Sequence, residues 1–302
     1  MKIISENPSP GNPDARIELP DSSGSVTLWW RETPVLDGTR VGAIDGFSAS
    51  SSAAAQTLLD EAAERLREAG CRIAVGPMDD NTWRTHRFVV ESDGRGPFLM
   101  EPRNPPEYPA WWRAAGFSEL SRYSSSAVPL DGMATVSPAL QARLARSVTV
   151  EPLDSTRFDE ELDRIYQVSL ASFAGNFLYT PLEREAFLAA YQKLRDRIDP
   201  DLVRIARRGG EPCGFVFGMP DLEAVARGEK PALIVKTLAV DPASRCAGLG
   251  SLLVDELHRI GREKGYTEAI HALQHETNTS LKITGRHHGG AFRRYALFSR
   301  LL

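Results

Sequence analysis

The chain has 302 residues, of which 42% are hydrophobic and 25% are charged, and its formal net charge is −4. This length suits two domains with separate cores, and the mildly acidic balance excludes a general attraction to nucleic acid or to an anionic membrane. The three cysteines, Cys71, Cys213 and Cys246, stand apart in the sequence. Their isolation argues against a disulfide framework and against a cysteine-rich zinc site, so we predict no metal.

The N-terminal segment, residues 1–14, is rich in proline and polar residues and is predicted to be flexible. It lacks the apolar core of a signal peptide, and no apolar run in the chain reaches the ~20 residues that span a bilayer. On this pattern we expect a cytoplasmic protein without a membrane partner.

Part of the first half aligns with the second half at a fixed shift of 195 residues, which places Gly70 on Gly265. In both halves an amphipathic helix is predicted to end at this glycine, and a short strand follows, Ile73–Val75 in the first half. An earlier strand, Val41–Asp45, lies opposite the strand that ends at Val240. The pattern indicates an internal duplication of one strand–loop–helix–strand unit.

The halves are predicted to meet in a linker over residues 131–146, with a first domain over 15–130 and a second over 147–302. The linker contains a short helical segment, Pro138–Arg146, and Asp154 is a good N-cap for the helix that follows. The second domain then continues with a helix from Pro181 to about Arg197, strands Val203–Ala206, Cys213–Gly218 and Leu233–Val240, a helix, the strand Glu268–His275, a short helix and a final strand.

A glycine turn, Arg245-Cys-Ala-Gly248-Leu-Gly250, lies between the strand Leu233–Val240 and an amphipathic helix. Such a turn directs several backbone N–H groups to one place, and the helix dipole adds about half a positive charge there. These termini bind phosphate, and glycines allow a bulky diphosphate to approach the backbone. The dinucleotide-binding pattern Gly-x-Gly-x-x-Gly is absent. The turn therefore predicts an anion-binding loop, against the alternative of an ordinary structural turn.

The order Arg-x-x-Gly-x-Gly resembles the coenzyme A pyrophosphate loop of the GNAT N-acetyltransferase superfamily, and residues 147–302 follow the element order of that family. In the first half, Ser50, Ala53 and Ala55 take the places of Arg245, Gly248 and Gly250. The resemblance thus implies one degenerate copy and one site for acetyl-CoA or coenzyme A. The residues expected to bind this donor are Leu238, Ala239, Val240, Arg245, Cys246, Ala247, Gly248, Leu249, Gly250, Ser251 and Asn278, the last either by contact or as a helix cap.

Further stretches, such as Gly76-Pro77-Met78, Ala174–Phe177 and Glu276–Asn278, resemble a tandem-GNAT group of bacterial acyltransferase-like proteins. That resemblance implies an N-terminal half that shapes the acceptor pocket and a C-terminal half that binds the acyl donor. The sequence thus predicts an α/β (α+β) protein with two tandem GNAT-like domains, each a mixed central β-sheet flanked by helices.

Candidate substrate-binding residues lie in polar loops of both halves. The mixed-charge segment around Asp79, Asn81 and Arg84 is either a solvated loop or a wall that faces the C-terminal half. Tyr108 follows a stiff proline pair and is either scaffold or pocket rim. Asn176 completes this set of candidates.

Acyl transfer from a thioester to an amine requires a base for the amine, donors for the oxyanion and an acid for the thiolate. Glu276 follows the strand Glu268–His275 and is the candidate base. The family's usual acid, a tyrosine on the next helix, would fall near Gly285, where the sequence has none. We therefore name Tyr179 or Tyr295 as the candidate acid.

His271 and His275 lie four residues apart on one predicted strand, so their side chains are expected on the same face. This spacing suits two packed or hydrogen-bonded histidines. A zinc pair is the weaker interpretation, because the sequence offers no third ligand.

The predicted function is that of a coenzyme A-dependent N-acyltransferase that acts on a small-molecule amine, with acetyl as the favoured acyl group. A non-catalytic, coenzyme A-binding or structural tandem protein is the alternative, and the missing helix tyrosine favours it. A transferase that uses charged tRNA is a third interpretation, against which the net charge of −4 counts. The tandem halves can mimic a dimer, so the sequence is compatible with a monomer.

Overall fold

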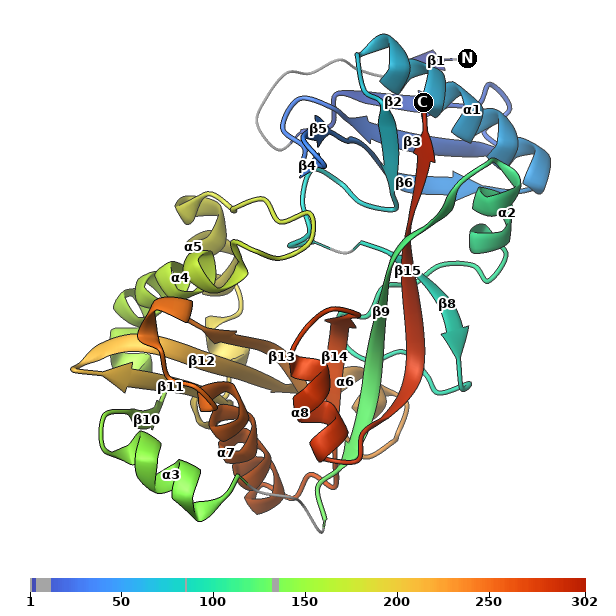
Figure 1. The fold of residues 1–302 in the computed structure, drawn as a ribbon. Coiled ribbons are helices and arrows are strands. Elements are labelled where there is room, and N and C mark those ends of the chain that lie inside the picture. The colour runs from blue at the N-terminus through green and yellow to red at the C-terminus, as the bar shows by residue number, and fades with distance from the viewer. Residues whose placement is uncertain (1, 4–11, 85, 132–135) are drawn as a thin grey trace.

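The computed structural model describes residues 2–3, 12–84, 86–131 and 136–302 (Figure 1). The predicted flexible segment 1–14 and the predicted linker 131–146 lie partly outside the described residues. Of the helices that the structure describes, none is both long and apolar enough to cross a membrane.

Almost all strands belong to one continuous mixed sheet in the order β1-β2-β3-β6-β7-β15-β9-β14-β13-β12-β11-β10, with β8 beside β15 and a separate β4-β5 pair. The strands are β1 (Lys2–Ile3), β2 (Ala15–Glu18), β3 (Gly24–Trp29), β4 (Val35–Leu36), β5 (Thr39–Arg40), β6 (Gly42–Ala49), β7 (Ile73–Gly76), β8 (Phe88–Ser92), β9 (Ser118–Pro129), β10 (Thr149–Pro152), β11 (Val203–Arg208), β12 (Glu211–Pro220), β13 (Leu233–Val240), β14 (Glu268–His275) and β15 (Gly290–Leu301).

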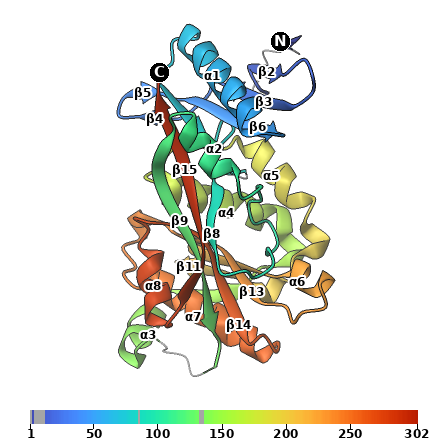
Figure 2. The same ribbon diagram turned by 90° about the vertical axis from the view of Figure 1, so that its right-hand side faces the viewer.

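Helices cover both faces of this sheet in two separate groups, one for each half of the chain (Figures 1 and 2). They are α1 (Ser52–Glu68), α2 (Tyr108–Ala114), α3 (Pro138–Ala145), α4 (Phe158–Phe173), α5 (Arg184–Gln192), α6 (Leu222–Ala226), α7 (Leu249–Glu263) and α8 (Ser280–Arg286). The helix expected over 181–197 is shorter than predicted, because Arg195–Arg197 form a separate 3-10 turn. Asp154 acts as an N-cap, as predicted, since its carboxylate accepts the N–H of Thr156.

The same strand–helix–strand unit occurs in both halves. In the first half β6 and β7 are parallel and α1 connects them, and in the second half β13 and β14 are parallel and α7 connects them. Gly70 and Gly265 follow the two helices with φ of 84° and 90°, which confirms them as helix-ending glycines. The first strands of the two units do not follow the shift of 195, because Gly42 pairs with Ala74 whereas Leu233 pairs with Ala269.

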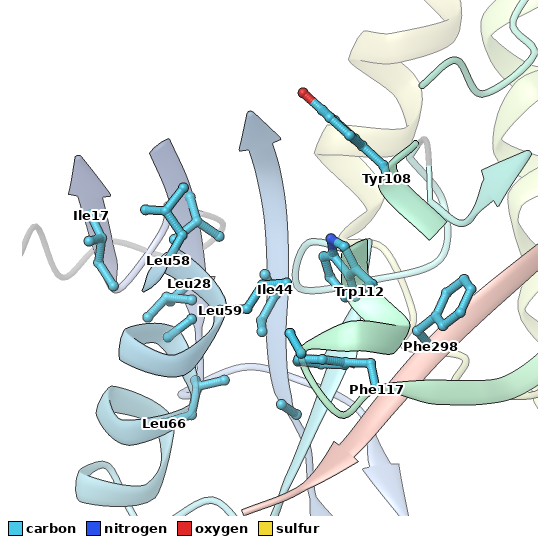
Figure 3. Close-up of a cluster of buried hydrophobic side chains, with 14 of the residues drawn as sticks. Ile17, Leu28, Ile44, Leu58, Leu59, Leu66, Tyr108, Trp112, Phe117 and Phe298 are labelled. Atoms are coloured by element: carbon cyan, nitrogen blue, oxygen red, sulfur yellow. The ribbon is translucent and has the colours of Figure 1, made fainter. Parts of the chain in front are cut away.

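Each half has its own apolar core. In the first half, α1 and α2 pack on one face of the sheet and bury side chains from both helices and from β2, β3, β6, β7, β8 and β15 (Figure 3). Leu59, Ala62 and Leu66 are buried at the three- and four-residue spacing of a helix face, which explains why this stretch is helical. In the second half, α7 packs on one face of β11–β13 and α4 packs on the other.

The two halves exchange their last strands. β9 belongs to the first half in sequence but pairs with β14 from Glu268↔Pro129 to His275↔Tyr123, and β15, the last strand of the second half, pairs with β7. β9 and β15 also pair with each other, and both run the length of the molecule between the two helix groups (Figures 1 and 2). The predicted separation at residue 130 therefore divides the sequence but not the sheet.

Candidate active site

β13 and β14 separate part-way along their length. They pair in parallel only from Leu233↔Ala269 to Val235↔His271, although β13 continues to Val240 and β14 to His275. Leu273 causes part of this separation, because its φ of 57° interrupts the strand and shifts the register with β9. We call the opening between residues 236–240 and 272–275 the fork.

The fork exposes main-chain groups of β13. Asp241 N–H donates to Cys213 on the β12 side, whereas Val240 N–H points the other way and donates to Ser172 Oγ of α4 at 3.2 Å. Because N–H groups alternate along a strand, Leu238 N–H points to the same edge as Val240 N–H, into the fork. The predicted donor strand Leu238–Val240 thus presents a hydrogen-bond donor at an open sheet edge.

The predicted anion loop lies at the end of β13 and opens α7. Arg245 and Gly248 have left-handed φ values of 52° and 88°, which fold the chain back into the helix. Gly248 is the N-cap and provides no side-chain hydrogen bond, so the first N–H groups of α7, including those of Gly250 and Ser251, remain uncapped. The φ of 88° favours glycine at this turn, and a Cβ there would also lie 2.9 Å from Leu140 Cδ1 and displace that side chain.

Three arginines surround this loop that sequence reasoning did not single out. Arg143 of α3 donates to the Ala247 carbonyl at 2.6 Å, and Arg208 of β11 donates to the Ser244 carbonyl at 2.7 Å. Arg286 of α8 donates to Ser251 Oγ. They come from three distant elements, and no local sequence pattern relates them to the loop.

Residues 79–84 of the first half meet the α4–α5 connection of the second half, and we call these two segments together the wall. Within the wall, Trp83 Nε1 donates to the Thr180 carbonyl at 3.1 Å. The Trp83 ring also packs against Phe173 and Tyr179, at centroid distances of 6.0 and 6.1 Å. Tyr179 Oη is buried without a hydrogen-bond partner among the described residues, and burial raises the pKa of Tyr179.

The candidate residues of this wall bond mainly to one another. Arg84 contacts Asp79 at 2.6 Å and Asp80 at 3.0 Å, Asn81 N–H donates to Asp79, and the Asn81 amide group donates to Asp80. This network fixes the shape of the wall. Asn176 lies exposed in the α4–α5 connection, with its carbonyl accepting from Tyr179 N–H.

Two further cations lie at the fork. Arg87 Nη1 donates to the Leu273 carbonyl at 3.3 Å, and its guanidinium lies 3.9 Å from the centre of the Tyr123 ring. Lys236 is the first β13 residue beyond the paired segment, and burial together with Arg87 lowers the pKa of Lys236 to about 8. A single charge within the apolar run Leu233–Val240 is the sequence signal for this residue.

Residues 162–282 match the acetyltransferase (GNAT) family, and this segment includes the fork, the loop and α7. The C-terminal half of the chain contains a GNAT domain. Protein YghO of Escherichia coli strain K12 is 25% identical over 168 residues, which cover 53% of this chain and 42% of that protein. The chain therefore spans less than half the length of this curated relative.

Solved structures share the fold of both halves. The GCN5-related N-acetyltransferase from Sphaerobacter thermophilus has a TM-score of 0.56 at 14% identity, over 94% of this chain and 79% of that one. A tandem GNAT protein from the clavulanic acid biosynthesis pathway has a TM-score of 0.50 at 13% identity, over 92% and 79%. The glucosamine N-acetyltransferase region of a fungal β-N-acetylglucosaminidase has a TM-score of 0.58 at 15% identity, over 94% of this chain and 33% of that one. These likenesses confirm the predicted α/β class and tandem GNAT architecture.

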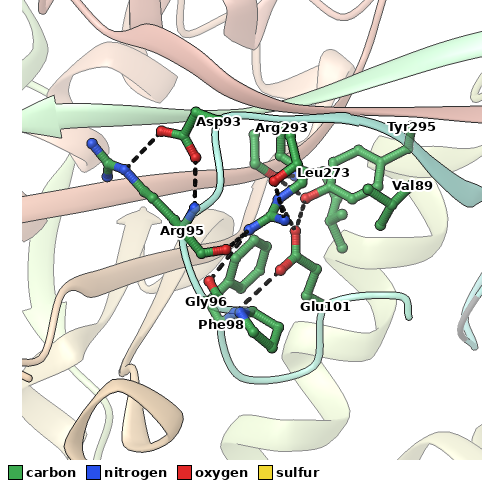
Figure 4. Close-up of polar contacts among 12 residues, drawn as sticks. Val89, Asp93, Arg95, Gly96, Phe98, Glu101, Leu273, Arg293 and Tyr295 are labelled. Atoms are coloured by element: carbon green, nitrogen blue, oxygen red, sulfur yellow. Dashed lines mark hydrogen bonds and ion pairs between the residues drawn. The ribbon is translucent and has the colours of Figure 1, made fainter. Parts of the chain in front are cut away.

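The structure gives both Tyr108 and Tyr295 structural roles. Tyr108 packs against Phe47 and Phe88 in the core of the first half, and its hydroxyl accepts the N–H of Ala49, so it belongs to the scaffold and not to an acceptor pocket. Tyr295 is fully buried, and its hydroxyl donates to the Glu101 carboxylate (Figure 4). Burial and Glu101 raise the pKa of Tyr295 strongly. Because the hydroxyl is fully buried and already contacts Glu101 and Ser125, this side chain is a structural hydrogen-bond donor.

Glu276 does not point into the fork. Its carboxylate accepts the N–H of Arg122 at 3.0 Å and its own N–H donates to the Arg122 carbonyl, so the residue extends the pairing of β14 with β9. β9 lies on the opposite side of β14 from β13. The prediction that Glu276 is the base of the GNAT domain is therefore corrected.

His271 and His275 lie on opposite faces of the sheet, which contradicts the prediction from their spacing. His271 contacts His258 of α7 at 3.0 Å, whereas His275 stacks on Phe177 and contacts Tyr123 on the other face. The left-handed Leu273 between them reverses the alternation of side chains. Among the described residues, no three His, Cys, Asp or Glu side chains are arranged to hold a metal.

Asn278 lies directly before Thr279, the N-cap of α8, and its side-chain oxygen accepts the N–H of Ser280, the first residue of that helix, at 2.8 Å. Asn278 thus has the helix-capping role that its position favours. The corresponding helix start in the first half differs from α7. There Ser51 is the N-cap, and its hydroxyl accepts the N–H of Ala54 at 3.2 Å. The third backbone N–H of the helix is therefore free in α7, where it belongs to Ser251, but is already hydrogen-bonded in α1, where it belongs to Ala54.

Proposed function

We propose that this protein transfers an acyl group from acyl-CoA to the amine of a small molecule, with acetyl-CoA as the favoured donor. The observation that carries the proposal is the uncapped glycine turn of α7 beside the open edge of β13. The turn offers N–H groups and a helix dipole to a diphosphate, and Arg143, Arg245 and Arg286 supply positive charge close by. The residues present therefore fit coenzyme A.

Acyl-CoA supplies a thioester whose carbonyl carbon accepts an amine nitrogen, so that a C–N bond forms and the C–S bond breaks. Leu238 N–H, at the open edge of β13, is placed to donate to the carbonyl oxygen as negative charge develops on it. The wall around Trp83 and Tyr179 limits the access of water from the side of the first half.

The proton of the amine requires an acceptor other than Glu276, and we assign it to Asp45, directly or through water. Asp45 lies two residues beyond Ala43, the last β6 residue paired with β7, on the face that packs against Tyr123 and Leu178. Burial, with a smaller contribution from Asp79, raises the pKa of Asp45 to about 6. A base near neutrality is effective, because it is ionised and still holds the proton it receives.

Tyr179 remains the candidate that protonates the leaving thiolate. Its hydroxyl has no partner among the described residues, and a phenol is protonated at neutral pH. α8 contains no tyrosine, so this acid would come from the α4–α5 connection instead.

Calorimetry with coenzyme A, followed by thiol release from acetyl-CoA over a panel of amines, tests the function. Binding with amine-dependent thiol release supports a transferase. Binding without turnover on any amine supports the alternative, a coenzyme A-binding protein without catalysis, and the absence of binding contradicts both.

A further inference from the structure

Two cations at the fork lack a negatively charged partner. Arg87 is 8% exposed, and its side chain donates to the carbonyls of His86 and Leu273, at 3.0 and 3.3 Å, and covers the ring of Tyr123. Within the described chain, neither Arg87 nor Lys236 takes part in an ion pair. Lys236 is half-buried. A buried charge such as that of Arg87 is normally paired, because desolvation of an isolated charge is costly.

Three nearby carboxylates are already neutralised by other arginines. Asp79 and Asp80 pair with Arg84, and Glu101 pairs with Arg293 at 3.1 Å. Among the described residues, Asp45 and Glu276 form no ion pair with Arg87 or Lys236, and the Glu276 carboxylate accepts the N–H of Arg122 instead. The two cations of the fork therefore have no salt-bridge partner.

The two cations belong to different elements that converge on the fork from both sides. Lys236 directly follows Val235, the last β13 residue paired with β14, and Arg87 reaches β14 at Leu273, where that strand bends away. They lie close enough to repel each other, and burial with this repulsion lowers the pKa of Lys236 to about 8, while burial lowers the pKa of Arg87 to about 10. His86 lies beside them and is neutral, since burial holds its pKa well below the usual range.

We propose that Arg87 and Lys236 together bind a carboxylate of a substrate, carried either by the amine acceptor or by the far end of the acyl group. A guanidinium and an ammonium on two sides of one opening suit a carboxylate, which accepts several charge-assisted hydrogen bonds. Its negative charge compensates both cations at once, the buried Arg87 and the half-buried Lys236. The inference rests on the proposed function, because it takes the fork as the place where donor and acceptor meet.

Calorimetry with acetyl-, malonyl-, succinyl- and glutaryl-CoA tests whether the acyl group of the donor carries the carboxylate. If the acyl group carries the carboxylate, one of the three acidic donors binds the wild-type protein more tightly than acetyl-CoA. Lys236→Met should then reduce this advantage by about ten- to hundredfold, the size of one charged hydrogen bond to a buried partner. Lys236→Arg should retain most of it.

Calorimetry on the protein with coenzyme A bound tests whether the amine acceptor carries the carboxylate. The amines compared differ only by a carboxylate, such as lysine against cadaverine and phenylalanine against phenethylamine. If the acceptor carries the carboxylate, the amino acid binds more tightly, and Lys236→Met removes this preference. Lys230→Met, at an exposed position just before β13, is the matched control and should leave every preference unchanged.

Each arm has its own interpretation. A carboxylate preference in either arm that Lys236→Met removes and Lys230→Met keeps supports the proposal and identifies the source. No preference in either arm, or a preference that Lys236→Met leaves intact, overturns it. Affinity for coenzyme A itself should survive in Lys236→Met, so a failure of this inference differs from a failure of the proposed function, in which coenzyme A does not bind at all.

Discussion

The buried histidine pair of the C-terminal half should make stability depend on pH. His258 and His271 are 0% and 4% exposed, and their Nε2 atoms share one proton across 3.0 Å. Burial, followed by the neighbouring histidines, lowers the pKa of His258 to about 2 and that of His271 to about 3, from an ordinary value of 6.5. Protonation of both rings would direct two N–H groups at each other without solvent.

The direction follows from proton binding in the two states. Below pH 6.5 the unfolded chain takes up protons at these histidines and the folded chain does not, so stability is full above pH 6.5 and falls as the pH decreases. At pH 5 each histidine removes about 2 kcal/mol, so the pair removes about 4 kcal/mol relative to pH 8. Any folded pKa below about 4 gives nearly the same result.

Urea unfolding followed by tryptophan fluorescence at pH 8 and pH 5 measures this effect. The double variant His258→Gln/His271→Gln removes it, and all other titrating groups, including Asp45 with its opposite contribution, are common to both proteins and cancel. The wild-type protein should lose about 4 kcal/mol more than the double variant between pH 8 and pH 5. His288→Gln, at an exposed position, is the control and should behave as the wild type. Equal losses in the wild type and the double variant would refute the reasoning.

Three further predictions concern the site. Gly248→Glu should abolish coenzyme A binding in calorimetry. The new side chain would contact Leu140, strain a φ of 88° and place negative charge at the start of α7. Unchanged affinity would contradict the assignment of the loop. Titration should give one coenzyme A per chain, since Ser51 caps α1, and a stoichiometry of two would show that the first half also binds. Asp45→Asn should cut turnover by about 10²–10⁴-fold and remove the acidic limb near pH 6 from the pH profile of turnover. Glu276→Gln should have little effect on turnover. The reverse result would restore Glu276 as the base.

Local patterns determined much of this molecule. The glycine turn before α7 was evident from Gly248 and Gly250, because a positive φ and a close approach to a ligand both restrict the choice of residue. The repeated unit was visible through Gly70 and Gly265, and the capping roles of Asp154 and Asn278 followed from their positions before helices. These features depend on interactions within a few residues, which the sequence records directly.

The composition of the site was decided only by tertiary structure. The strand exchange of β9 and β15 gives each half a strand of the other, and the single left-handed residue Leu273 moved His275 to the opposite face and opened the fork. Arg87 and Lys236 are far apart in sequence, and the positive charge of Arg87 influences Lys236 only because the two halves share one sheet. By itself the sequence determined where a diphosphate can approach a helix, since that requires local backbone geometry. Which side chains face the reacting groups depends on long-range strand pairing, which no local pattern encodes.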